Sequence, residues 1–337
     1  MAIDLFPDGP ASLPNKLLAG TAMLAAAGAT CVAYGVFVER HWYRLAHYEV
    51  PVLPEGTEPL TLLHLSDLHF VAGDPRKARF LATLPRPDLT VVTGDLLGEP
   101  EGVEPVVEAL RPVRGRIASY VVLGSNDYYA PRWLNYAAYF RWRRKHRTAT
   151  RSRPGDLIAQ LEADGWVHLR NRRTELRAGG VPFEILGMDD PHIERHDLRA
   201  APRSDPDAVG LAIVHAPDPA PELAALGYDL IVSGHTHGGQ VRMPFVGALV
   251  SNCTIPNRLA MGMARMGGTY LHVSPGLGSS KYAPFRFLCR PEATILELTP
   301  AGHTPAETAS APVHLVAGHS RPIRDVAQFG SAQRSGR

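Results

Sequence analysis

The chain has 337 residues, of which 45% are hydrophobic and 20% are charged, so it can bury one large core or two modest ones. Its formal net charge of +2 is too small to indicate a nucleic acid as the partner. The three cysteines, Cys31, Cys253 and Cys289, are widely spaced and lack CxxC spacing, so neither a disulfide framework nor a thiolate zinc site is indicated.

The first predicted element is an apolar helix over residues 17–38, which contain no charged side chain. A helix of this length rises about 1.5 Å per residue and is long enough to cross a hydrocarbon core of about 30 Å. Arg40, Trp42, Tyr43 and Arg44 follow it, as an interfacial belt would. The stretch is longer than the core of a signal peptide, which favours an uncleaved single-pass membrane anchor over a cleaved signal peptide. The flanking charges do not fix which side of the membrane carries the rest of the chain.

Five segments are predicted in chain order. They are an N-terminal segment (1–16), the transmembrane helix (17–38), a belt and proline-rich connector (39–59), a folded domain (60–299) and a tail rich in Ala, Pro, Gly, Ser and His (300–337). The tail has no hydrophobic periodicity and is expected to be disordered.

Short apolar runs rich in β-branched residues predict buried strands in the folded domain. They span 60–65, 89–92, 120–123, 166–169, 182–186, 211–214, 230–232, 270–273 and 294–298. Helices are expected near 75–84, 101–110 and 220–226. The chain thus opens as βαβαβ, and the whole pattern predicts an α/β fold of two packed sheets flanked by helices.

Residues 131–155 form an insertion of different character, with many arginines set among aromatic residues and no acidic residue between 132 and 153. A solvated basic loop is one interpretation. A segment that lies on an anionic membrane surface is another, since each basic side chain there contributes about 1 kcal/mol. A clamp for a phosphate-rich substrate is the third.

Polar residues follow the apolar runs where several strands are expected to end, in the fragments LSDLH, TGD, GSND, VHAPD and GHTHGG. Loops at the carboxyl ends of strands are where ligands bind in layered α/β folds, so these fragments can converge on one point. The candidate metal ligands among them are Asp67, His69, Asp95, His215, His235 and His237.

Imidazole and carboxylate ligands together suit manganese, iron or zinc better than calcium. The carboxylate of Asp95 can bridge two cations with its two oxygens. Asp67 and His69 are separated by one residue, as are His235 and His237, so both side chains of each pair can face the same side. Two divalent cations about 3.5 to 4 Å apart can hold a bridging hydroxide and stabilise the charge of a phosphoryl group under attack. The chemistry expected of such a site is hydrolysis of a phosphoester or pyrophosphate bond.

The order DxH, GD, GSND, H and GHTHGG over 60–298 resembles the calcineurin-like metallophosphoesterase superfamily. The segments GHTHGGQ, SPGLGSS and RPE are similar to its membrane-anchored bacterial branch, which includes the UDP-2,3-diacylglucosamine pyrophosphatase-like proteins. The resemblance implies a four-layer sandwich of two mixed sheets between helices, a metallophosphoesterase domain over 60–299 and two divalent metal ions as cofactors. It also implies a first metal held by Asp67, His69 and His237, a bridging Asp95, and a second metal held by His215 and His235.

One motif departs from the family pattern, which has GNH followed by Asp or Glu at the third position. This chain has Gly124, Ser125, Asn126 and Asp127 there. Either Ser125 is a weak ligand and Asn126 only hydrogen-bonds the phosphoryl group, or the loop shifts so that Asn126 binds the second metal, which is the reading we favour. Asparagine cannot donate a proton as the family's histidine does, so we expect a preference for good leaving groups.

A substitute acid could come from the segment 188–192, MDDPH, which follows an apolar run. His192 or Asp190 could reach into the cleft from there, and the alternative is an Asx-type turn with a surface histidine.

These features predict a membrane-anchored dinuclear phosphohydrolase that cleaves a phosphodiester or pyrophosphate bond by attack of a metal-bridging hydroxide. The expected substrate is a phosphorylated small molecule or a lipid-linked compound. A catalytically weakened metal-binding or regulatory module is the alternative, suggested by the GSND motif. A nucleic-acid phosphodiesterase is a third idea, against which the membrane anchor argues.

Overall fold

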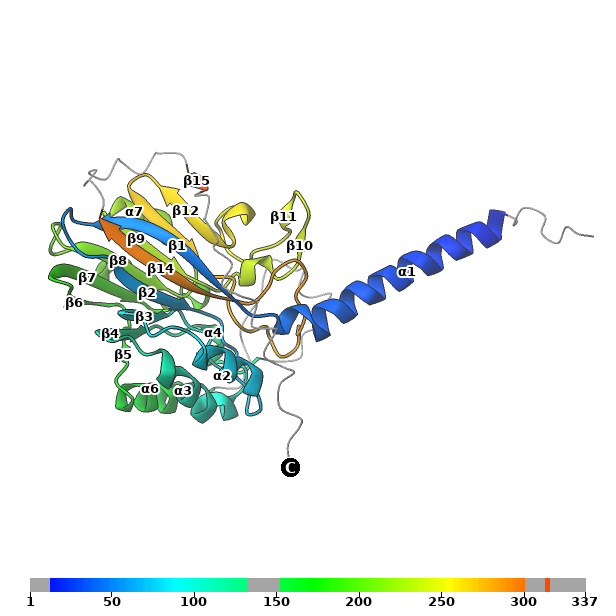
Figure 1. The fold of residues 1–337 in the computed structure, drawn as a ribbon, viewed down its shortest axis with the longest axis horizontal. Coiled ribbons are helices and arrows are strands. Elements are labelled where there is room, and N and C mark those ends of the chain that lie inside the picture. The colour runs from blue at the N-terminus through cyan, green and yellow to red at the C-terminus, as the bar shows by residue number, and fades with distance from the viewer. Residues whose placement is uncertain (1–12, 132–151, 301–312, 316–337) are drawn as a thin grey trace, which may run out of the picture.

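The computed structural model describes residues 13–131, 152–300 and 313–315. One long helix, α1 (Leu13–Phe37), projects from a body in which two β-sheets are stacked (Figure 1). The basic aromatic insertion predicted over 131–155 lies outside the described residues from 132 to 151, and helix α6 begins at its far end. The N-terminal 12 residues and most of the C-terminal tail also lie outside.

The first sheet has six strands with a mostly parallel arrangement. In spatial order they are β1 (Arg44–Leu53), β14 (Glu292–Pro300), β2 (Leu60–Leu65), β3 (Leu89–Val92), β4 (Ala118–Val121) and β5 (Val167–His168). Strands β2 to β5 run parallel to one another, and only the β14 and β2 pair is antiparallel.

The second sheet has seven strands. Their spatial order is β15 (Val313–Leu315), β12 (Gly262–Met266), β13 (Thr269–Val273), β9 (Leu230–Ser233), β8 (Val209–Val214), β7 (Val181–Met188) and β6 (Arg172–Ala178). The central strands β13, β9, β8 and β7 are parallel, and both edges are antiparallel. A separate hairpin pairs β10 (Arg242–Met243) with β11 (Gly247–Ala248).

Alternation along the strands places one apolar set between the sheets and another against helices. In β2, Leu62 joins the inter-sheet cluster with residues of β8 and β9, whereas Leu63 joins the cluster that includes the helices on the outer face of the first sheet. Those helices are α2 (Pro75–Ala82), α3 (Val103–Leu110) and α6 (Pro154–Ala163). Helix α7 (Ala220–Ala225) covers the outer face of the second sheet. The predicted order of helix, sheet, sheet and helix is confirmed.

Within the segment predicted as a belt and proline-rich connector (39–59), residues 44–53 form strand β1, which pairs in parallel with β14. Pro51 lies within it, and this is tolerated because β1 is an edge strand and loses no ladder bond on its open side. Val50 and Leu53 of this strand are buried between the sheets. Three residues of the tail predicted to be disordered form the short edge strand β15, which pairs with β12. The folded body therefore includes residues on both sides of 60–299.

Helix α1 is long and apolar enough to cross a membrane, and only 6% of its apolar window is buried in the structure. Its last turns dock on the loop at 284–290. A side chain at Gly35 would meet the Arg286 carbonyl at 2.5 Å and the Phe285 ring at 2.7 Å, so the contact requires glycine. Just beyond α1, the buried carboxylate of Glu39 accepts hydrogen bonds from the backbone amides of Leu288, at 3.0 Å, and Cys289. These bonds fix the base of the helix to the folded body.

Candidate metal centre

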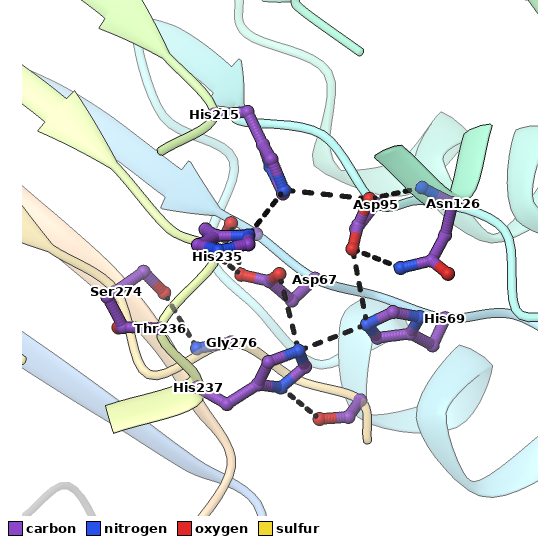
Figure 2. A network of polar contacts seen from close by, with 12 residues as sticks. Asp67, His69, Asp95, Asn126, His215, His235, Thr236, His237, Ser274 and Gly276 are labelled. Atoms are coloured by element: carbon purple, nitrogen blue, oxygen red, sulfur yellow. Dashed lines mark hydrogen bonds and ion pairs between the residues drawn. The ribbon is translucent and has the colours of Figure 1, made fainter. Parts of the chain in front are cut away.

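Loops at the carboxyl ends of strands from both sheets meet at one buried point (Figure 2). The loop after β2 carries Asp67 and His69, and the loop after the parallel β3 carries Asp95. From the second sheet, the parallel strands β8 and β9 lead to His215 and to the turn that holds His235 and His237. The six candidate ligands, far apart in sequence, are therefore brought together.

Asp67, His69 and His237 form a first group, whose ligand atoms all lie within 4.8 Å of one another. Nε2 of His69 and Nε2 of His237 are 3.2 Å apart, and Nε2 of His237 is 3.5 Å from Oδ1 of Asp67. The two imidazole rings are stacked with their centroids 5.0 Å apart. Three donor atoms thus point at one small volume.

Asp67, Asp95 and His215 form a second group that satisfies the same distance limit. Asp95 spans the two groups, because its Oδ1 is 3.6 Å from Nε2 of His215 and its Oδ2 is 3.7 Å from Nε2 of His69. His235 approaches from the side, with its Nδ1 3.3 Å from Nε2 of His215. The geometry fits Asp95 as a bridge, and it gives Asp67 a place in both groups that the sequence did not suggest.

The backbone of five of these residues is left-handed, a conformation that side chains other than glycine rarely adopt. They are Asp67 (φ 49°), His69 (φ 44°), Asp95 (φ 51°), His235 (φ 67°) and His237 (φ 50°). Each such residue costs on the order of 1 to 3 kcal/mol, and outliers of this kind cluster at functional sites. The surrounding fold therefore holds these five side chains in a conformation that their own backbone disfavours.

His215 is oriented by its surroundings. Its Nδ1 lies 2.7 Å from the carbonyl oxygen of Thr93, to which it donates a hydrogen bond, and this leaves Nε2 directed at Asp95. Two glycines make room for the ring: a Cβ at Gly94 would lie 2.8 Å from His215 Nδ1, and one at Gly124 would lie 2.6 Å from His215 Cε1. The glycine of the GSND motif is thus required by the histidine that it contacts.

Asn126, in helix α4 (Ser125–Tyr128), binds the carboxylate of Asp95. Its backbone amide donates to Oδ1 of Asp95 at 2.8 Å, and its side-chain amide donates to Oδ2. The buried side chain of Asp127 holds this turn in place, because it accepts hydrogen bonds from the amides of Gly124 and Leu97, both at 2.9 Å. Asn126 thus lies at the centre, as both readings of GSND require, and the choice between Ser125 and Asn126 as metal ligand stays a prediction.

The residue that the sequence did not reveal is Arg286, which is fully buried behind His237. Its Nη2 donates to the carbonyls of Pro275 at 2.8 Å and of Gly278, and it lies 3.4 Å from Nδ1 of His237. The same Gly278 carbonyl lies 3.3 Å from Nδ1 of His237. The sequence shows only a single arginine within the apolar run Phe285–Cys289. This arginine cannot be assigned to the site until the position of the loop is known.

Burial favours the neutral form of three of the histidines. It lowers the pKa of His69 to about 4, and burial together with Arg286 lowers the pKa of His237 to about 3. Burial, assisted by the neighbouring His192, also lowers the pKa of His235 well below its usual value. Neutral imidazole is the form that binds a metal ion.

The pKa values of His215 and Asp95 are shifted in the direction opposite to the one that burial alone would produce. Burial opposes the charge on His215, but the carboxylates of Asp95, Asp190 and Asp67 raise its pKa to about 9. Burial likewise opposes ionisation of Asp95, but His215, His69 and the Asn126 donors hold its pKa far below the usual range. The carboxylate of Asp95 is therefore ionised and available to cations.

The donor set fits divalent metal ions. Oδ1 of Asp67 and Nδ1 of His69 are buried and have no hydrogen-bond partner among the described residues. Burial raises the pKa of Asp67, so its charge is poorly compensated by the protein alone. A cation between the two groups would satisfy Oδ1 of Asp67 and relieve that deficit.

His192, one of the two suggested acids, is brought to the site: its ring lies against the ring of His235, with centroids 4.3 Å apart. It sits in a short 3₁₀ turn (Pro191–Ile193) whose first amide hydrogen bond is to Asp190, as expected of an Asx-type turn. Oδ2 of Asp190 is buried without a hydrogen-bond partner in the described part of the chain, and burial raises the pKa of this carboxyl to about 7. The segment therefore forms the Asx-type turn, and it also brings His192 next to the site.

Two stacked sheets that deliver imidazoles and carboxylates to one buried point form the scaffold of a metal-dependent hydrolase. The model of the calcineurin-like phosphoesterase family matches residues 60–239, which is more than half of the chain. The chain belongs to this family and is a hydrolase that acts on phosphoester bonds.

Several relatives are similar over most of the chain. A Bacillus subtilis protein named uncharacterized metallophosphoesterase YkuE is 26% identical over 83% of this chain and 93% of its own length. The Escherichia coli phosphodiesterase YaeI is 26% identical over 81% of this chain and 96% of its own. A bovine transmembrane protein with metallophosphoesterase domain is 30% identical over 75% of this chain and 56% of its own.

We expect the substitution Asp67→Asn to abolish metal binding at the first group and to stabilise the metal-free chain by about 1 kcal/mol. The reason is that burial disfavours the ionised carboxylate in the folded state, as its raised pKa indicates, whereas water solvates it in the unfolded state. Thermal unfolding in excess chelator measures the change. Asp207→Asn, at an exposed turn, is the control, and a lower midpoint for Asp67→Asn than for the wild type would contradict the expectation.

We also expect the apparent affinity for divalent metal ions to rise with pH across the neutral range. Below its metal-free pKa of about 9, His215 carries a proton that the metal must displace, so affinity increases by about tenfold per pH unit for each proton released. Titration calorimetry in buffers of different ionisation enthalpy counts the protons. His47→Ala, on the edge strand β1, should leave that number unchanged, and an affinity independent of pH would refute the assignment.

Proposed function

We propose that this hydrolase works through a dinuclear metal centre and cleaves a phosphodiester or pyrophosphate bond. The observation that carries the proposal is the position of Asp95, whose two carboxylate oxygens face ligands of two different groups at 3.6 and 3.7 Å. When bound, two divalent ions such as manganese, iron or zinc activate a water molecule and neutralise charge on the phosphoryl group.

The protein's own residues have three tasks in this reaction. Asp67, His69 and His237 would hold one ion, and His215 and His235 the other. Asn126 fixes the orientation of Asp95 through two hydrogen bonds, so that both carboxylate oxygens keep their directions. The strained loops and the buried Arg286 keep the ligands in place before substrate arrives, which lowers the reorganisation needed during the reaction.

We further propose that α1 anchors the enzyme in a membrane as a single pass and that the substrate is an amphiphilic or lipid-linked phosphoester. Support comes from the length and exposure of α1 and from relatives that are named transmembrane proteins. The membrane-anchored branch that includes the UDP-2,3-diacylglucosamine pyrophosphatase-like proteins, whose late segments this sequence resembles, sets the substrate class that we would test first.

The purified chain is expected to bind two metal ions and to hydrolyse bis-p-nitrophenyl phosphate, a soluble diester with a good leaving group. Asp95→Asn should lower turnover by at least about 10³-fold, because removal of the bridging charge disrupts both metal positions. Asp207→Asn is the matched control at an exposed site. Two bound metals without turnover in the wild type would favour the regulatory module suggested by the GSND motif.

His192 is the residue that we propose as a partial replacement for the missing histidine acid. Its ring lies against His235, which would hold the second ion, and a cleft of about 340 Å³ opens beside Pro191 and His192, so the imidazole can be reached from solvent. Asn126 cannot fill the role, since its amide donates to Asp95 and has no acidic proton to give.

Rates across aryl esters of graded leaving-group pKa should fall as the leaving group becomes poorer, and His192→Ala should make the slope steeper. The loss on the poorest leaving group is expected to be about 10-fold or more, and the loss on the best one small. His168→Ala, in the edge strand β5, is the control. An unchanged slope in His192→Ala would return this histidine to a packing role, and a flat wild-type dependence would refute the preference for good leaving groups.

A further inference from the structure

The segment 241–250, VRMPFVGALV, is an exposed apolar hairpin with no acidic residue. Strands β10 and β11 form it, and Phe245 at its tip is fully exposed in a left-handed conformation with φ 64°. Its exposed large hydrophobic side chains are Met243, Phe245, Val246, Leu249 and Val250. A soluble surface rarely gathers so many apolar side chains in one short segment, and such patches mark interaction sites.

Both ends of the hairpin touch the metal centre. At its start, Gly238 and Gly239 follow His237 directly, and the Gly238 carbonyl accepts a hydrogen bond from Arg242 at 2.9 Å. At its end, the carbonyl of Asn252 lies 3.4 Å from Nε2 of His235. Whatever covers the hairpin therefore lies within a few residues of two metal ligands.

The base of the hairpin is also joined to the loop on which α1 docks. The amide of Arg242 donates to the Phe287 carbonyl at 2.9 Å, and the amide of Phe287 donates to the Gln240 carbonyl at 3.0 Å. Phe287 contacts the Tyr34 ring of α1 edge-on. The hairpin rises from the body on the side from which α1 leaves it (Figure 1).

We propose that the β10–β11 hairpin inserts its apolar tip into the same lipid surface that α1 enters, as a second membrane contact beside the metal centre. The hairpin and the exposed apolar helix are continuous through the loop 284–290, where Leu288 is a further exposed apolar side chain. Trp42 and Arg290, stacked at 4.0 Å beyond the end of α1, provide the aromatic and basic pair that suits a headgroup region.

The chemistry of the hairpin selects a lipid over a protein partner. Its tip offers flexible and aromatic apolar side chains without the acidic groups or paired polar atoms that fix the register of a protein interface. A single basic residue, Arg242, suits anionic headgroups. The contact would hold the metal centre near the bilayer surface, where a phosphoester that stays in the lipid is close to it. This inference rests on the proposed membrane anchoring of α1 and deepens it.

The test uses the full chain reconstituted in vesicles of phosphatidylcholine and phosphatidylglycerol with brominated acyl chains, which quench nearby tryptophan. The emission added by Phe245→Trp should fall about two-fold or more relative to unbrominated vesicles. The emission added by Val167→Trp, in β5 at the far edge of the first sheet, should not fall. Val246→Trp is a second probe of the tip, and retained metal content shows that each variant is folded.

The native Trp42 separates the two proposals. Quenching that disappears in Trp42→Phe shows that α1 is in the bilayer, so an unquenched Phe245→Trp in the same vesicles overturns the hairpin contact alone. Loss of both signals overturns the anchoring as well. A two-chain mass by light scattering in detergent that becomes a one-chain mass in Phe245→Asp would assign the hairpin to a second copy and also overturn the lipid contact.

Discussion

The contact on which the site depends is the one between the Asp95 carboxylate and the groups around it. His69 comes from the first sheet, His215 comes from the second, and Asn126 holds the carboxylate between them. Since Asp95 lies at the end of a central strand of one sheet and His215 at the end of a central strand of the other, the stacking of the sheets fixes their separation. Inter-sheet packing of residues such as Leu62 and Ile213 therefore sets the geometry of the chemistry.

The centre is costly to build. Its ligands are buried, several have a left-handed backbone, and the charge of Asp67 is poorly compensated by the protein. The site is maintained by the structure around it. Strands with fully buried apolar faces lead into the ligand loops, and backbone hydrogen bonds from neighbouring loops fix the conformation of those loops. A cation bound between these ligands would relieve the uncompensated charge of Asp67. The instability of the site without metal and its affinity for metal would therefore have the same origin.

Much of this arrangement could be predicted from the sequence, because polar residues at the ends of apolar runs must meet where parallel strands end together. Other parts could not. The prolines of segment 50–59 suggested a connector, but Pro51 lies in strand β1, and only the position of β1 at a sheet edge makes this proline acceptable there. Whether Ser125 or Asn126 is the metal ligand depends on a shift of one residue within a loop, which a motif cannot resolve. The role of Arg286 follows from its contacts with His237 and with α1, and a local sequence pattern cannot reveal such long-range contacts.

The clamp at the base of α1 has a mechanical consequence. Gly35 and Glu39 attach the helix to the same loop that supplies Arg286. The orientation of the helix relative to the folded body is therefore set by these contacts, not by a flexible linker. With α1 in a bilayer, the cleft would stay at one height and one tilt, and it would meet substrates by lateral diffusion in the plane. An anchor of equal hydrophobicity but different sequence at its last turn would keep the protein in the membrane and still point the metal centre elsewhere.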